Sequence, residues 1–89
     1  MSLRNDLDAS IRALGFALNR FYWEGNPDHQ IYSLAGVLNL LISFPEGDSE
    51  ARAYLVNSLR EWNDKGYIKF NEQDTDRYVE VINPSFSFL

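Results

Sequence analysis

Residues 55–68, Leu-Val-Asn-Ser-Leu-Arg-Glu-Trp-Asn-Asp-Lys-Gly-Tyr-Ile, contain the change from a helical to an extended pattern that decides the fold. Leu55, Leu59 and Trp62 recur at the spacing of one helix face, so they predict the apolar side of a helix. Gly66 stands where a left-handed residue commonly ends a helix. This stretch therefore predicts a helix that ends just before a strand.

Downstream of this stretch the apolar residues alternate, first in residues 67–71 and again in residues 77–82. Residues 71–76 between these runs are polar throughout, and two alternating runs around a polar loop predict a β-hairpin. Asn83-Pro84 ends the second strand, because proline removes a donor from a strand ladder. The apolar tail 85–89 alternates once more.

Upstream, the third helix is predicted over 49–65, with Asp48 or Ser49 as its capping residue. A first helix is predicted over 3–22, because one apolar stripe repeats there at helical spacing. The residues of this stripe are Leu3, Leu7, Ile11, Leu14, Leu18 and Phe21.

The segment between them is predicted as a second helix over 28–42, and two readings of its start stay open. In one, Asn26 is the cap and Pro27 the first helical residue. In the other, residues 29–31 are extended and Ser33 is the cap.

Length and composition predict a single α+β domain over 1–89, with three helices followed by a hairpin. The chain has 89 residues, fewer than the roughly 100–150 of a typical domain. Its aromatic content of 15% supplies a core, and without cysteine that core has no disulfide support. No apolar stretch approaches the roughly 20 residues of a membrane span, so we expect a cytoplasmic protein without a membrane partner.

The order of helix, helix, turn, helix and hairpin resembles that of the winged-helix superfamily, over about residues 31–83. Residues 55–68 look like the end of a winged-helix recognition helix and the start of the wing. Residues 76–81 are similar to the returning wing strand, and residues 33–35 resemble the opening of the preceding helix. The break at residues 43–48 departs from the family, because a compact helix-turn-helix has a turn of about three or four residues.

The resemblance implies a DNA-binding transcription regulator, which would act as a dimer. Candidate DNA contacts are Arg52, Asn57, Arg60, Lys65, Lys69 and Arg77. The net charge of −5 opposes this function, and the acidic residues gather where phosphates would approach. They are Glu46, Asp48 and Glu50 at the third helix, and Glu72, Asp74 and Asp76 in the wing loop.

No catalytic, cofactor or metal site is expected. The single histidine, His29, lies in a polar turn, and no nucleophile elbow or phosphate loop is present. The acidic run at residues 72–76 lacks the glycine of a calcium loop, because Arg77 occupies that position. We expect neither enzymatic activity nor a small-molecule substrate, and we read the run as a solvated hairpin turn.

The function expected first is therefore a non-catalytic protein-protein interaction domain, which self-associates as a homodimer or docks on a basic partner. The DNA-binding regulator is the alternative, and an acidic inhibitor or immunity-type protein is the third. The candidate interface residues are Tyr67, Tyr78, Phe86, Phe88 and Leu89.

Overall fold

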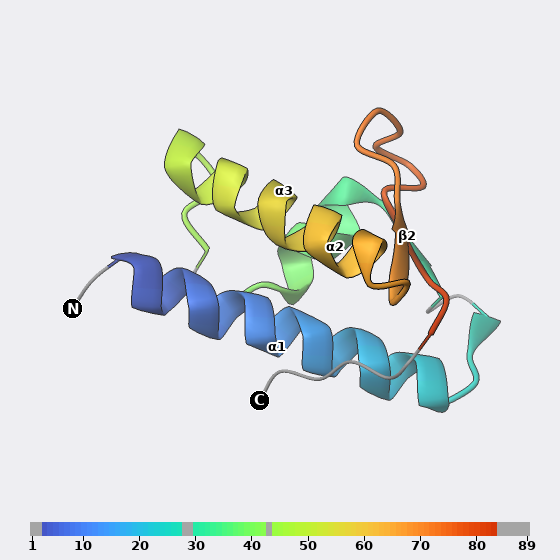
Figure 1. Ribbon diagram of the computed structural model, residues 1–89. Coiled ribbons are helices and arrows are strands. Elements are labelled where there is room, and N and C mark those ends of the chain that lie inside the picture. Colours follow the sequence, from blue (N-terminus) through green and yellow to red (C-terminus); the bar gives the residue numbers. More distant parts are fainter. Residues whose placement is uncertain (1–2, 28–29, 43, 84–89) are drawn as a thin grey trace.

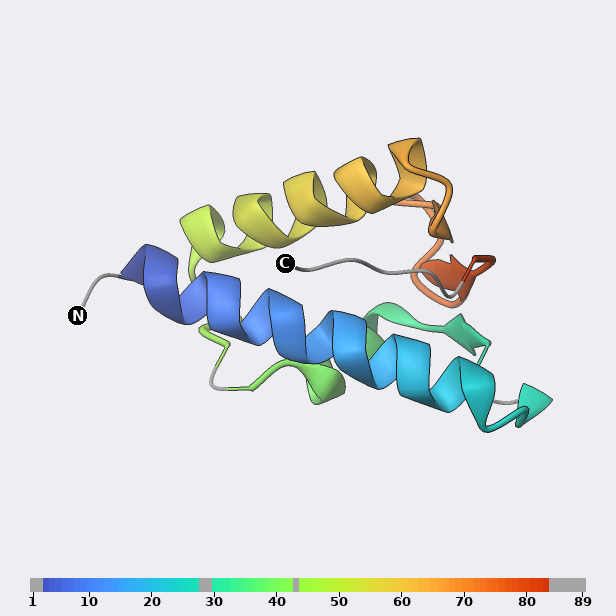
Figure 2. The ribbon, with the colours of Figure 1, turned by 60° about the horizontal axis from the view of Figure 1, so that its bottom comes forward.

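The protein is an α+β chain, as predicted, in a computed structural model that describes residues 3–27, 30–42 and 44–83. The elements in order are α1 (Leu3–Trp23), β1 (Ile31–Tyr32), α2 (Leu34–Leu40), α3 (Ser49–Asp64), β2 (Ile68–Phe70) and β3 (Val79–Val81). In Figure 1, α1 and α3 run beside each other, and the sheet stands at one end of the pair. Figure 2 shows α1 between α3 and α2.

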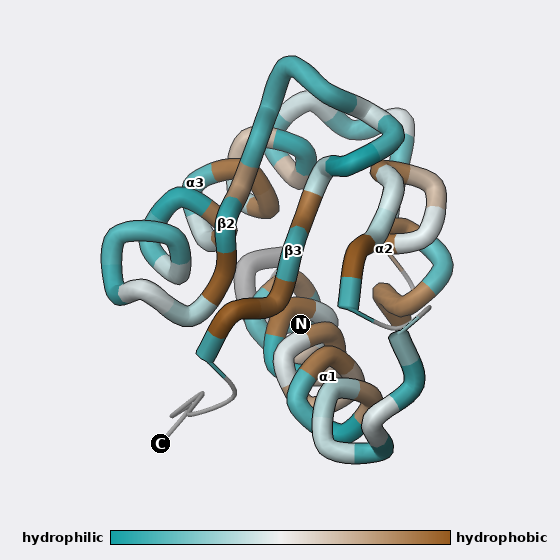
Figure 3. The backbone as a smooth tube through the Cα atoms, turned by 90° about the vertical axis from the view of Figure 1, so that its right-hand side faces the viewer, coloured by the Kyte–Doolittle hydropathy of each residue, from teal (hydrophilic) through white to brown (hydrophobic). Residues whose placement is uncertain are grey.

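The sheet has three antiparallel strands in the order β1-β3-β2, so the last strand of the chain is the central one. Glu80 of β3 pairs with Ile31 on one side and with Lys69 on the other. The hairpin is therefore confirmed, and its strands lie inside the predicted ranges 67–71 and 77–82. The loop that joins β2 to β3 is hydrophilic along most of its length (Figure 3).

The prediction of a second helix over 28–42 is wrong in its bounds, since α2 begins at Leu34 and ends at Leu40. The carbonyl oxygens of Gln30 and Tyr32 accept hydrogen bonds from Val81 and Tyr78, both at 2.9 Å, so this segment is committed to the sheet. Ser33 then caps α2, and its Oγ accepts from the amide of Gly36 at 3.0 Å. Of the two readings, the structure favours the one with an extended piece before a Ser33 cap.

The prediction for α3 is confirmed to within one residue. The carboxylate of Asp48 accepts from the amides of Glu50 and Ala51, at 2.9 and 3.0 Å, and so caps the helix. Gly66 follows the helix with a φ of +80°, the left-handed conformation that ends it.

One buried cluster holds the elements together, and every helix and strand contributes to it. Of the predicted stripe of α1, Leu7, Ile11, Leu14 and Leu18 are buried and Phe21 is partly buried, whereas the side chain of Leu3 lies outside the described part of the chain. Leu14 and Leu18 are fully buried and share the cluster with Leu55 and Leu59 of α3. From the sheet, Ile68, Val79 and Val81 close this core, together with Trp62 from the end of α3 and Tyr32 from β1.

Candidate functional site

A groove of about 430 Å³ lies between α3, the start of α2 and the β2–β3 loop. Its volume falls within the range of about 300–1,000 Å³ that is typical of ligand sites. The residues that line it are Leu34, Arg52, Ala53, Val56, Asn57, Arg60, Glu72, Thr75 and Tyr78. Apolar and charged side chains are mixed there, which suits a ligand with both characters.

The β2–β3 loop forms one wall of this groove and is held by hydrogen bonds of its own. Asp74 accepts from the amides of Asp76 and Arg77 at 3.0 and 3.1 Å, and Asn71 accepts from the amide of Gln73 at 3.2 Å. These contacts are typical of Asx turns, in agreement with the predicted hairpin turn. The carbonyl of Thr75 then accepts from the amide of Leu34 at 2.8 Å, which ties the loop to the start of α2.

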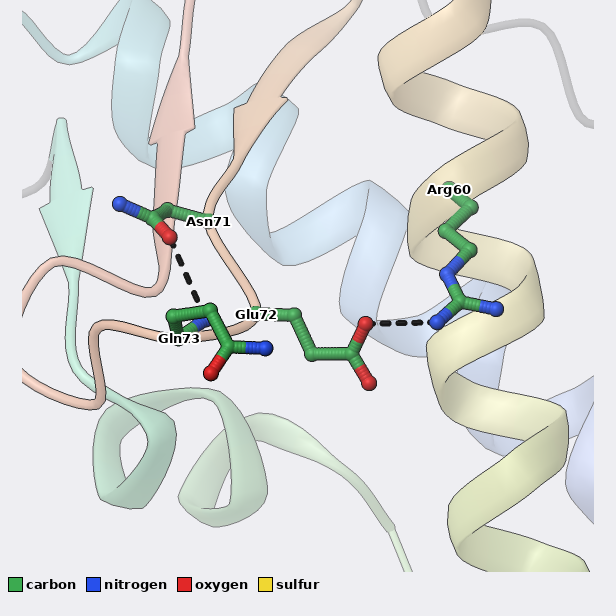
Figure 4. Close-up of polar contacts among 4 residues, drawn as sticks. All are labelled: Arg60, Asn71, Glu72 and Gln73. Atoms are coloured by element: carbon green, nitrogen blue, oxygen red, sulfur yellow. Dashed lines mark hydrogen bonds and ion pairs between the residues drawn. The ribbon is translucent and has the colours of Figure 1, made fainter.

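Arg60 joins α3 to the opposite wall. Its Nη2 lies 2.6 Å from Oε2 of Glu72, a contact that crosses from the helix to the loop (Figure 4). Nearby, the side chain of Asn63 accepts from the amide of Phe70 at 2.9 Å. The positive charge of Arg60 is therefore balanced by a carboxylate of the same chain. This ion pair, at the surface, connects α3 to the β2–β3 loop at one end of the groove.

Tyr78 contributes a polar atom to the groove from a ring that is otherwise in the core. The residue is 4% exposed, and its ring meets that of Phe70 edge-on at 5.0 Å. Burial raises the pKa of its phenol, Glu72 raises the pKa further, and Arg52 and Arg60 lower it. The hydroxyl thus stays protonated at neutral pH and can donate a hydrogen bond.

Arg52 is the charged residue of the groove that is available to bind a ligand. It is exposed, and it forms no ion pair with any carboxylate in the described part of the chain. An arginine in this condition can bind a carboxylate or a phosphate through two parallel hydrogen bonds.

The structure brings together three of the six candidate DNA contacts, namely Arg52, Asn57 and Arg60. Lys65 instead pairs with Glu61 at 3.1 Å on α3. Lys69 and Arg77 line a separate small hollow on the sheet together with Asn71, Asp74 and Glu80. The six residues therefore do not form one continuous basic stripe.

The structure describes two of the five candidate interface residues, Tyr67 and Tyr78, and neither is fully exposed. Tyr78 is corrected from a surface contact to a core residue, because its ring packs under the β2–β3 loop. Tyr67 is half-buried, and its carbonyl accepts from the amides of Ile82 and Asn83, both at 3.0 Å. Phe86, Phe88 and Leu89 lie outside the described residues, as does His29.

The outer face of α1 is a second candidate surface, which the sequence analysis did not predict. Trp23 is 70% exposed and Phe16 is 58% exposed. Phe16 falls between Leu14 and Leu18 but off their stripe, and that offset is the signal that marks it as outward-facing.

Nowhere in residues 3–27, 30–42 and 44–83 do three or more histidine or carboxylate side chains gather as ligands for a metal ion. In the same part of the chain, no helix combines the length and the apolar character needed to cross a membrane.

Comparison with known proteins gives no match, whether with protein-family models, with curated proteins or with solved structures. The groove and the outer face of α1 are therefore the features of the molecule that bear on its function.

Proposed function

We propose that the chain is a winged-helix-like domain. Three helices followed by a β-hairpin support this arrangement, and so does the continuation of the sheet through β1 onto the central strand β3. The connection between α2 and α3 remains longer than the turn of a compact helix-turn-helix. Since a fold hosts many functions, the function itself has to be argued from the surfaces.

We propose that the domain is a non-catalytic protein-interaction module that self-associates through the outer face of α1. The observation that carries this proposal is the exposure of Phe16 and Trp23, which lie seven residues apart on one helix. Aromatic residues are enriched at protein interfaces, and tryptophan is enriched among the residues that dominate binding energy.

A second copy is the favoured occupant because the charges beside these two rings are balanced. Asp8 and Arg12 precede Phe16, and Arg20 and Glu24 flank Trp23. Arg20 already pairs with Glu24 at 3.2 Å. Two protomers could therefore approach along α1 without the repulsion that the net charge of −5 creates over the whole molecule.

Sedimentation over a range of protein concentrations tests this proposal. We expect the wild type to form dimers and the double variant Phe16→Ser/Trp23→Ser to dissociate at least about 30-fold more easily, as the loss of a dominant contact predicts. The variant Ile82→Ser is the matched control, because Ile82 is also exposed but does not belong to α1. A wild type that stays monomeric at millimolar concentration would contradict self-association through α1.

A chain that lacks residues 85–89 belongs in the same experiment. If the tail carries the interface, the truncated chain should be monomeric while its α1 face is intact. If α1 carries it, truncation should leave the dimer unchanged.

Docking on a basic partner is the other form of the interaction proposal. The acidic residues near the start of α3 support it, since Glu46 and Glu50 are exposed. Asp48 contributes less, because its carboxylate already accepts two backbone hydrogen bonds. Asp74 is engaged in the same way within the β2–β3 loop.

Sequence-specific DNA binding is the second candidate function, and one observation favours it. Arg52, Asn57 and Arg60 share one side of α3, where side chains of a recognition helix would meet base edges. Against it, Glu72 neutralises Arg60, and the chain carries a net charge of −5.

A gel-shift assay on genomic fragments at low and moderate salt separates the two functions. We expect no shifted band even at low salt, because too few free cations are available to release counterions from the phosphates. A sequence-selective band that Arg52→Gln removes would establish the DNA-binding function instead.

A further inference from the structure

We propose that the groove between α3 and the β2–β3 loop binds a short extended peptide, one that carries an acidic side chain two residues from an apolar one. This site lies apart from the outer face of α1 and does not depend on self-association. Three features of the groove support the proposal. They are the spacing of the α3 side chains that line it, the distribution of charge along it and its apolar floor.

The spacing comes from α3. Arg52, Val56 and Arg60 follow one another at intervals of four residues, so they form one row along the groove. Neighbours in this row are about 6 Å apart along the helix axis. Alternate side chains of an extended chain point to the same side and are about 6.6 Å apart. An extended peptide alongside α3 can therefore place one side chain at Arg52 and the next but one at Val56.

The charges give the peptide its chemistry and its orientation. At one end, Arg52 has no carboxylate partner within the described chain, so an acidic side chain of the ligand can pair with it. At the other end, Arg60 is already held by Glu72 at 2.6 Å. A second acidic group there would meet the carboxylate of Glu72, so one acidic residue at the Arg52 end fits best.

The floor accepts the apolar side chain. Leu34, Ala53 and Val56 line the groove together with the edge of the Tyr78 ring. A tyrosine phenol is protonated at neutral pH, so the hydroxyl of Tyr78 can donate a hydrogen bond to a peptide carbonyl. Apolar contact and a single directed hydrogen bond are the usual means by which a groove selects an extended segment.

The same features disfavour a nucleic acid strand in this groove. A phosphate backbone presents a charge at every nucleotide, whereas the groove offers one unpaired cation and also contains Glu72. A peptide with one carboxylate presents its charge only at Arg52.

Selection from a phage-displayed library of random peptides tests the proposal. We expect the wild type to enrich peptides in which Asp or Glu stands two positions from a large apolar residue. The variant Arg52→Glu should enrich Lys or Arg at the acidic position instead. The matched control is Arg12→Glu on α1, since Arg12 is also exposed and without an ion pair among the described residues. It should select the wild-type motif.

Synthetic peptides then locate the binding. For an enriched peptide, replacing its acidic residue by the matching amide should weaken binding to the wild type at least 10-fold. The same replacement should change binding to Arg52→Gln less than 2-fold. In nuclear magnetic resonance spectra, the amides of Val56, Asn57 and Thr75 should shift on titration, whereas those around Phe16 should not.

Three results would overturn the proposal: no enrichment by the folded wild type, a motif without an acidic position, or the same motif from Arg52→Glu. The double variant Phe16→Ser/Trp23→Ser keeps this test separate from that of self-association. It should bind the peptide as the wild type does, even if the wild type proves to be monomeric.

Discussion

Replacing Ile68 by Ala should lower the free energy of unfolding by about 2–5 kcal/mol, as is typical when a fully buried aliphatic side chain is truncated. Ile68 is 1% exposed and begins β2, immediately after the turn at Gly66. It pairs with Val81 across the sheet and belongs to the same buried cluster as Trp62. Its truncation would remove apolar contacts and leave a cavity where α3 meets the sheet, and both changes cost stability.

Ile82→Ala is the matched control, because it is the same chemical change at a residue that is 51% exposed. Urea denaturation of the three proteins measures the difference, and we expect Ile82→Ala to stay within about 1 kcal/mol of the wild type. Equal losses at the two positions would contradict the burial of Ile68 against α3. An unchanged slope of unfolding free energy against urea would show that the two variants expose the same surface on unfolding.

Alkaline conditions should destabilise the fold, with Tyr32 as the main identified cause. Burial raises the pKa of its phenol from 10.0 to about 12, and Glu24 adds to the rise. Below pH 10 the phenol is protonated in both the folded and the unfolded chain, so this stability is fully present. Between pH 10 and about 12 only the unfolded chain loses the proton, so the free energy of unfolding falls as the pH rises.

The expected loss approaches about 1.4 kcal/mol for each pH unit in the middle of that window, and it amounts to about 1.5 kcal/mol between about pH 10 and pH 11.5. Tyr78 acts in the same direction, because burial raises its pKa as well. Chemical denaturation of the wild type and of Tyr32→Phe over this range provides the measurement. The difference at about pH 8 gives the cost of removing the hydroxyl itself, which is then subtracted.

After that subtraction, Tyr32→Phe should lose less stability than the wild type as the pH rises. Parallel curves for the two proteins would show that Tyr32 ionises equally in the folded and unfolded chains. That result would contradict its burial at β1.

The helices illustrate what local patterns predict well. The stripe of α1 and the inward residues of α3 follow from helical periodicity alone, because the apolar residues of a helix that packs on a core must share one face. The end of α3 follows equally from Gly66, whose φ of +80° is accessible to glycine at little cost.

The short strand β1 illustrates what local patterns leave open. Residues 29–34 are compatible with a helix start or with an extended segment, and the local sequence pattern does not separate the two. The choice depends on Tyr78 and Val81, whose backbone amides donate hydrogen bonds to the carbonyl oxygens of Tyr32 and Gln30. Since these partners are 46 and 51 positions away in the chain, no local signal records them.

By itself, the sequence determined the α+β class, the α3-to-β2 junction and the acidic net charge, because each depends on composition or on short-range periodicity. Only the tertiary structure decided which charged side chains form ion pairs or hydrogen bonds within the described part of the chain and which stay available to a ligand. It pairs Arg60 with Glu72, uses Asp48 and Asp74 to hold backbone amides, and leaves Arg52 beside an apolar floor. The groove exists because the Thr75 carbonyl meets the Leu34 amide, a contact between segments that only folding brings together.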